Sequence, residues 1–245
     1  MIKLQKSDYL IHTIKLPISK KEISFRGWTM SQHKVLVLAF MGEDKKAVRR
    51  AMIQVMKDCI VDGMDPRTLP IMEFEYLFLQ IRARSVGETV YISLEDPKSK
   101  KAKRLEINLL DVKPSIDEDR KYKVDLVDTN GKPTGQFFIM REPTVVDQLE
   151  VLSLIDDDKE INQDIETAVR CVSMVCDSES QVSASELDQQ KEIREYVEGM
   201  TPKQYESIDG FLRGIPVLKH EVELSTVFPG RKGVYTLEGL EAFFG

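Results

Sequence analysis

The clearest hydrophobic pattern in the chain lies between residues 70 and 88. Apolar residues recur there at the i, i+3, i+4, i+7 spacing of one helix face: Phe74, Leu77, Phe78 and Ile81. Tyr76, Leu79 and Ala83 widen this face, so the helix should be covered on most of its circumference. Pro70 precedes it and Gly87 follows at the place of a C-terminal cap. The sequence therefore predicts a buried helix that ends at Gly87.

After Gly87 the pattern changes to strict alternation, which is typical of strands. The predicted strands are residues 88–95, 104–111, 121–128 and 135–140. The first two form one hairpin, and the last two form a second hairpin around Asn130-Gly131, a pair that readily adopts positive φ. We expect the two hairpins to form one four-stranded antiparallel sheet.

The N-terminal segment alternates as well, and residues 9–17 and 22–28 predict a small hairpin. A helix over 32–41 and a second over 45–61, capped by Asp44, should follow. The longest apolar run, Val35–Met41, is far shorter than the roughly 18–20 residues of a membrane span. We therefore expect it to be a core segment.

From Glu142 onward the sequence is acidic and mostly helical. The predicted helices cover residues 144–155, 160–176, 183–199 and 201–214, and a final one covers 237–244. The helix at Thr201-Pro202-Lys203-Gln204 has a cap, a first-turn proline and a capping-box glutamine. Residues 217–224 predict a strand. The predicted fold class is thus α+β, with helical N- and C-terminal parts around a small antiparallel β-sheet. The predicted domains are residues 1–87, 88–142 and 143–245.

Charge is distributed unevenly along this chain of 245 residues. Residues 1–123 contain 24 Lys/Arg and 17 Asp/Glu, whereas residues 124–245 contain 11 and 24. The two halves can attract each other, or complementary neighbours in an assembly. The N-terminus lacks the apolar region of a signal peptide, so a cytosolic location and no membrane partner are expected.

No catalytic or metal-binding constellation emerges. Cys59, Cys171 and Cys176 are odd in number, fall on predicted helix faces and have no histidine near them. Phosphate-binding, nucleophile-elbow and zinc-protease motifs are not found. The protein is therefore expected to be no enzyme, with no cofactor, no metal and no small-molecule substrate.

Several residues are candidates for a protein interface, each with a purely structural alternative. Trp28 either covers the core or anchors a partner, and Arg49 and Arg50 lie on a basic helix face that is either solvated or contacts an acidic neighbour. Phe243 and Phe244 either fill a partner groove or pack onto their own domain. Arg82 and Arg84 are expected to orient the helix and the following strand through hydrogen bonds to carbonyls or acids.

Several stretches resemble one known family. They are Leu16–Ser19, Ile23–Thr29, Gln32–Ala39, Thr68–Pro70, Phe74–Glu88, Thr201–Tyr205 and Leu237–Phe244. Together they resemble the baseplate proteins of T4-like tailed phages, the family tied to assembly of the baseplate hub. Cys-x-x-Cys turns found in some similar proteins are replaced here by residues 96–100 and 228–232, so a metal ribbon is not implied.

The resemblance implies a non-enzymatic protein that contacts other baseplate hub and tail proteins in the cytoplasm of an infected bacterium. It leaves open whether the protein is an assembly chaperone or a structural subunit retained in the virion tail baseplate. The regularly capped elements favour an assembly factor with its own core. Two other classes stay open as minor alternatives: an enzyme with a dispersed active site, and an adaptor that binds a host protein or nucleic acid through the Lys98–Lys103 loop.

Overall fold

The computed structural model describes residues 8–42, 44–96, 99–157, 161–185 and 187–243. The chain divides into two compact units, which are described separately. Unit 1 comprises Met1–Ile116 and Val217–Gly245, and unit 2 comprises Asp117–Pro216. Unit 2 is thus an insertion in unit 1, and where the chain returns, the Ser115 N–H donates to the Val217 carbonyl at 2.8 Å. The domain boundaries near residues 87 and 142 stay a prediction, because contacts do not reveal which segments fold alone.

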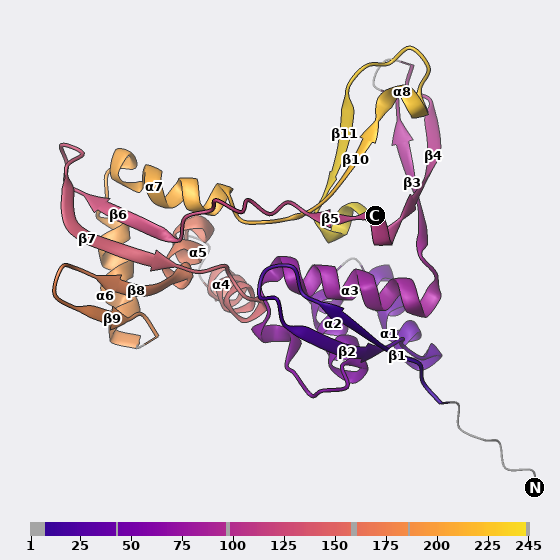
Figure 1. Ribbon diagram of the computed structural model, residues 1–245, viewed down its shortest axis with the longest axis horizontal. Helices are drawn as coiled ribbons and strands as arrows, with labels where there is room; N and C mark the ends of the chain where they lie inside the picture. The colour runs from indigo at the N-terminus through magenta and orange to yellow at the C-terminus, as the bar shows by residue number, and fades with distance from the viewer. Residues whose placement is uncertain (1–7, 43, 97–98, 158–160, 186, 244–245) are drawn as a thin grey trace, which may run out of the picture. The chain divides into compact units, whose positions relative to one another are not determined.

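Unit 1 is built around α3 (Ile71–Val86). Nine of its 16 residues are buried, which confirms the predicted buried helix. α3 contacts α2 (Lys45–Cys59), β2 (Glu22–Arg26) and β10 (Leu218–Glu223). It ends at Gly87, whose φ of 132° lies in a region that favours glycine. The helix therefore packs against both the N-terminal segment and the segment that returns after unit 2 (Figure 1).

The N-terminal elements of unit 1 follow the predicted order. β1 (Ile11–Lys15) pairs antiparallel with β2, from Ile11 opposite Arg26 to Lys15 opposite Glu22, so the hairpin is confirmed. α1 (Met30–Met41) and α2 form a helical hairpin, and the Asp44 carboxylate accepts the Lys46 N–H at 2.9 Å. A 3₁₀ turn, η1 (Pro66–Thr68), leads into α3.

Two further sheets belong to unit 1. β3 (Thr89–Glu95) and β4 (Ala102–Asn108) form the predicted hairpin, followed by η2 (Leu109–Asp111). β10 lies between β11 (Val234–Glu238) and the short β5 (Lys113–Pro114) in a three-stranded antiparallel sheet. The short helix α8 (Leu224–Val227) connects β10 to the loop before β11.

The described residues of unit 2 form one antiparallel sheet and four helices, which are labelled in Figure 1. The sheet contains β6 (Lys123–Val127), β7 (Pro133–Met140), β8 (Val172–Cys176) and β9 (Gln181–Ser183), in that order. The helices are α4 (Val145–Asp157), α5 (Gln163–Cys171), α6 (Leu187–Glu198) and α7 (Pro202–Arg213). The core joins residues from the sheet, α5, α6 and α7, among them Phe138, Val169, Ile193 and Phe211.

The predicted arrangement of one central sheet is wrong. The described residues form eight α-helices and four small antiparallel sheets that alternate along the chain. The first predicted hairpin, β3–β4, stays two-stranded in unit 1, while the second, β6–β7, pairs with β8 in unit 2. The fold class is α+β as expected, but the segment after residue 142 is not simply helical, since it contributes four strands.

Two predicted helices are partly or wholly strands. The helix expected over 160–176 ends at Cys171, and Val172–Cys176 instead pairs with β7, where its β-branched residues suit a pleated sheet. The helix expected over 237–244 is replaced by β11 and the 3₁₀ turn η3 (Leu240–Phe243). Gly239, with φ of 70°, separates these two elements. Residues 160, 186 and 244 of the predicted helices lie outside the described residues.

A buried carboxylate fastens the β1–β2 turn to α3. Glu73 is fully buried, and its Oε1 accepts the N–H groups of Ile18 and Ser19 at 2.7 and 2.6 Å. Its Oε2 is buried without a hydrogen-bond partner among the described residues. Glu73 thus acts as an acceptor for two turn amides, and its second oxygen is not needed for that role.

We predict that Glu73→Ala lowers the free energy of unfolding by about 2–3 kcal/mol, because two amides lose their acceptor and a cavity remains. Glu73→Gln keeps the accepting oxygen and should cost less than about 1 kcal/mol. Urea unfolding of the two variants measures the difference. Equal losses in both variants would contradict the acceptor role.

A second prediction concerns Asp147 in unit 2. Burial would raise the pKa of its carboxyl, but hydrogen bonds from Arg141 (2.6 and 2.9 Å) and from Thr144 outweigh burial and lower this pKa. A lowered folded-state pKa adds stability above the unfolded pKa of about 4, and that stability is lost as the pH falls. Asp147→Asn should therefore reduce the melting temperature at pH 7 more than at pH 3. A difference between wild type and variant that stays constant across this range would exclude the linkage.

Candidate protein-interaction surface

The helix α1 has an unusual composition for a surface element. Eight of its twelve residues are apolar, and Lys34 is the single charged residue within it. An apolar helix of this kind is normally covered by other structure on most sides. Here the packing partner is α2, which covers one side.

Most apolar side chains of α1 are exposed as a result. Leu36 is the buried residue of the helix, at 4% exposure. Ala39 is half-buried, and the other six are exposed. These six form what we call the α1 apolar face: Met30, Val35, Val37, Leu38, Phe40 and Met41. Met30 and Met41 are the most exposed, at 78% and 76%. The expectation that Val35–Met41 is a core segment is therefore wrong.

Lys34 lies in the middle of the α1 apolar face. Met30 and Leu38 are its i−4 and i+4 neighbours, and Val37 and Met41 follow at i+3 and i+7. Residues at these spacings adjoin one another on a helix surface. A single ammonium group is thus surrounded by exposed apolar side chains.

A further group of exposed apolar residues lies just before β1 and at its first position. Tyr9, Leu10 and Ile11 are 55%, 73% and 47% exposed. The Arg26 guanidinium lies 4.6 Å from the Tyr9 ring, and its Nη1 donates to Gln32 Oε1 of α1 at 3.3 Å. Tyr9 and the N-terminal turn of α1 are therefore neighbours, joined by one arginine.

The structure places Trp28 next to α1. Its ring is half-buried, with centroids 5.7 Å from Phe78 of α3 and 6.4 Å from His33 of α1. The backbone N–H of Trp28 donates to Ser85 Oγ at 2.8 Å. Trp28 thus covers the end of α3, and its part in an interface stays a prediction.

Arg49 and Arg50 lie in different environments on α2. The Arg49 guanidinium lies 5.5 Å from the Phe74 ring centroid and 3.9 Å from the Glu75 carboxylate, with 19% of its side chain exposed. Arg50 is exposed, and its Nε donates to the Lys46 carbonyl at 3.3 Å. Arg50 is therefore the member of this pair that a partner could reach.

Arg82 and Arg84 both donate to carbonyl oxygens near the α3–β3 joint. Arg82 Nη1 donates to the Gly87 carbonyl, and Arg84 Nη1 donates to the Gln80 carbonyl at 3.1 Å and to Gln80 Oε1 at 2.8 Å. The Arg84 guanidinium also lies 5.7 Å from the Phe25 ring of β2. These contacts link the end of α3 to its neighbours within unit 1.

Of the two C-terminal phenylalanines, Phe243 is buried and Phe244 is not among the described residues. Phe243 lies in η3, is 2% exposed and packs within its own unit. This packing is the structural alternative to a role as a partner anchor. Phe244 lies outside the described residues, so its interface role stays a prediction.

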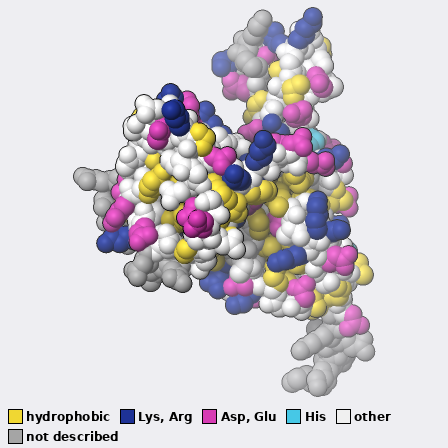
Figure 2. Space-filling model, turned by 60° about the vertical axis from the view of Figure 1, so that its left-hand side comes forward, with side chains coloured by type: hydrophobic (Ala, Val, Ile, Leu, Met, Phe, Trp, Pro, Cys, Tyr) yellow, Lys and Arg dark blue, Asp and Glu magenta, His cyan; other side chains and the backbone are white. Residues whose placement is uncertain are grey.

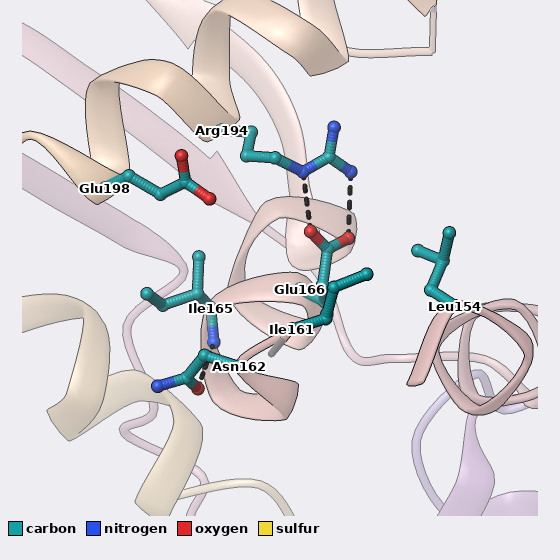
Figure 3. Close-up of a pocket in the computed structure, with 7 residues that line it drawn as sticks. All are labelled: Leu154, Ile161, Asn162, Ile165, Glu166, Arg194 and Glu198. Carbon is teal, nitrogen blue, oxygen red and sulfur yellow. Dashed lines mark hydrogen bonds and ion pairs between the residues drawn. The ribbon is translucent and has the colours of Figure 1, made fainter. Parts of the chain in front are cut away.

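Unit 2 contains an open groove of about 570 Å³ (Figure 3). It is lined by Leu154, Ile161, Asn162, Ile165, Glu166, Arg194 and Glu198. Glu166 accepts from Arg194 Nε and Nη2 at 2.5 and 2.8 Å, and the Asn162 side chain caps α5. Glu166, Arg194 and Asn162 therefore already have structural partners within unit 2, and Glu198 is the remaining acid of the lining.

Two of the buried cysteines, Cys59 and Cys171, are poor nucleophiles because their thiols resist deprotonation. Burial raises the pKa of Cys59 to about 11 and that of Cys171 to about 12, which keeps both thiols protonated near neutral pH. Cys176 is also buried and free. In the described ranges, no three His, Cys, Asp or Glu side chains gather in a way that could hold a metal ion.

Charge separates by structural unit. Unit 1 contains 24 Lys/Arg and 18 Asp/Glu, and unit 2 contains 11 and 23. Figure 2 shows basic and acidic side chains interspersed on the face in view, with no single broad basic area. Of the helices that the structure describes, none has both the length and the apolar composition to cross a membrane.

Comparison with known proteins gives one family match. The family model described as T4 bacteriophage base plate protein matches residues 9–245. The chain belongs to this family. No match was found among curated proteins or among solved structures. Membership confirms the family that the sequence resembled, and it supports a role related to the phage baseplate.

We predict that the double variant Arg82→Ala/Arg84→Ala melts about 2–6 °C lower than wild type, because two helix-end hydrogen-bond donors and one guanidinium–ring contact are lost. Differential scanning calorimetry provides the measurement. The matched control is Arg50→Ala/Lys101→Ala, which removes two exposed cations. An unchanged melting temperature in the first variant would refute the structural role of Arg82 and Arg84.

Proposed function

We propose that this protein is a non-enzymatic assembly factor for the phage baseplate hub, acting in the cytoplasm of the infected bacterium through contacts with other baseplate and tail proteins. The family match supports the baseplate role. The observation that carries the contact mechanism is the α1 apolar face, six exposed apolar side chains on one helix. Such exposed patches mark interaction surfaces in proteins.

The charge separation supports oriented binding. A unit of net +6 and a unit of net −12 in one chain create a strong charge asymmetry. Complementary potentials raise association rates and favour one orientation of approach. In a multi-component assembly, this property helps to order the docking of partners.

A non-enzymatic role is supported by the way polar groups are used. Glu142, one of the buried acids of unit 2, forms an ion pair with Arg120 at 2.8 Å and accepts from the Tyr122 hydroxyl at 3.2 Å. The Arg120 guanidinium also lies 4.1 Å from the Phe211 ring. Glu142 and Arg120 thus hold β6, α7 and the end of β7 together, and neither is displayed to a substrate.

A nucleic-acid adaptor has less support. In the Lys98–Lys103 loop, Lys103 Nζ donates to the Val227 carbonyl at 2.5 Å, and Lys100 lies 3.2 Å from the Glu95 carboxylate. Lys98 lies outside the described residues. Of the described lysines of this loop, Lys100 and Lys103 are engaged in these contacts, which weakens the case for counterion release on DNA or RNA, the process that drives such binding.

The test is a pull-down of the tagged full chain from phage-infected cells, with mass spectrometry of the bound proteins and of purified virions. We expect hub proteins among the captured partners and the tagged chain to be absent from virions. Uninfected cells provide the control.

Each other outcome has a definite meaning. Hub proteins captured together with the tagged chain in virions would make it a structural subunit retained in the baseplate. Capture of no baseplate or tail protein would overturn the proposed function. Salt-sensitive binding to DNA without protein capture would favour the adaptor.

A further inference from the structure

We infer that the α1 apolar face binds an amphipathic helix of another protein whose apolar side presents one Asp or Glu to Lys34. This inference names the partner chemistry of the surface above and rests on the proposed function. The first support is the position of Lys34, with Met30, Val37, Leu38 and Met41 around it.

Lys34 has no ion pair among the residues that the structure describes, and it is exposed. Covering the surrounding apolar side chains also removes water from its ammonium group. An ammonium group taken out of water without a counter-charge carries a large free-energy penalty. A partner that buries this face must therefore supply an acceptor, and a carboxylate is the acceptor with the matching charge.

The shape of the face favours a helix as the occupant. Met30, Lys34 and Leu38 form an i, i+4, i+8 row along α1. Rows of this kind form ridges that insert into the grooves of a second helix. The partner carboxylate then lies within its own apolar row, opposite the middle of the ridge.

A second copy of this chain does not fit. Symmetric packing of α1 against α1 would bring two Lys34 side chains together, and α1 itself contains no acid to compensate. The neighbouring helix α2 adds a further exposed cation, Arg50, whereas its exposed Lys45 is already paired with Glu241 at 3.2 Å. Like charges facing each other across the interface oppose such a dimer.

The test uses carbodiimide cross-linking, which joins an amine and a carboxylate only when they are in contact. The tagged full chain is incubated with lysate of phage-infected cells, cross-linked, purified and digested for mass spectrometry. We expect Lys34 to be linked to an Asp or Glu in an amphipathic helical segment of another baseplate protein.

Variants make the test quantitative. Lys34→Glu and Leu38→Asp should each reduce capture of that protein about tenfold or more, whereas Lys34→Arg should stay within about threefold of wild type. Val182→Asp, at an exposed apolar position of β9, is the matched control and should leave capture unchanged. Circular dichroism and melting curves check that each variant is folded, which is expected at exposed positions.

The remaining outcomes separate this inference from the proposed function. Baseplate proteins captured equally well by Lys34→Glu, or cross-linked elsewhere but never at Lys34, would overturn the inference and leave the function standing. A Lys34 link to an acid of this same chain, or a dimer that Leu38→Asp abolishes in light scattering, would also overturn it. Capture of no baseplate protein by wild type would overturn the function itself.

Discussion

The burial of α3 on most of its circumference is the constraint on which unit 1 depends. A helix with this many buried residues needs neighbours on several sides, and no local segment supplies them all. α2 and β2 come from the preceding part of the chain, whereas β10 arrives only after the whole of unit 2. The return of the chain at Val217 is therefore a requirement of the α3 packing. Unit 1 is complete only when both of its segments are present.

Local features that a short stretch can satisfy alone were predictable from the sequence. The β1–β2 hairpin, the Asp44 cap and the capping box at Thr201 and Gln204 depend on a few adjacent residues. Non-local pairing was not predictable in the same way. Val172–Cys176 continues a helical apolar pattern, yet it becomes a strand because β7 offers a free edge to it. The prediction of a helix at the C-terminus is wrong for a similar reason, since β11 forms against β10.

The candidate interface illustrates a different limit. From the sequence alone, Arg82 and Arg84 could be placed at a helix end and expected to donate to carbonyls or acids. In the structure both donate to carbonyl oxygens. No sequence pattern around Glu73 indicates its acceptor role, because that role depends on a turn more than fifty residues away. Trp28 and Phe243 are aromatic residues of the kind that anchor interfaces, but Phe243 is buried in the core of its own unit. Residue type therefore indicates what a side chain can do, and burial decides which of its roles remains open.

The α1 run shows why hydrophobicity alone cannot distinguish core from interface. Seven consecutive apolar residues, Val35–Met41, satisfy the pattern of a buried helix, and an obligate interface resembles a core divided between two chains. The feature that separates the two cases is Lys34, which precedes the run and shares its exposed face. A core position would exclude this cation, while a surface that is covered only on binding can keep it for a carboxylate supplied by the partner. One charged residue within an apolar helix thus carries more information about function than the apolar residues around it.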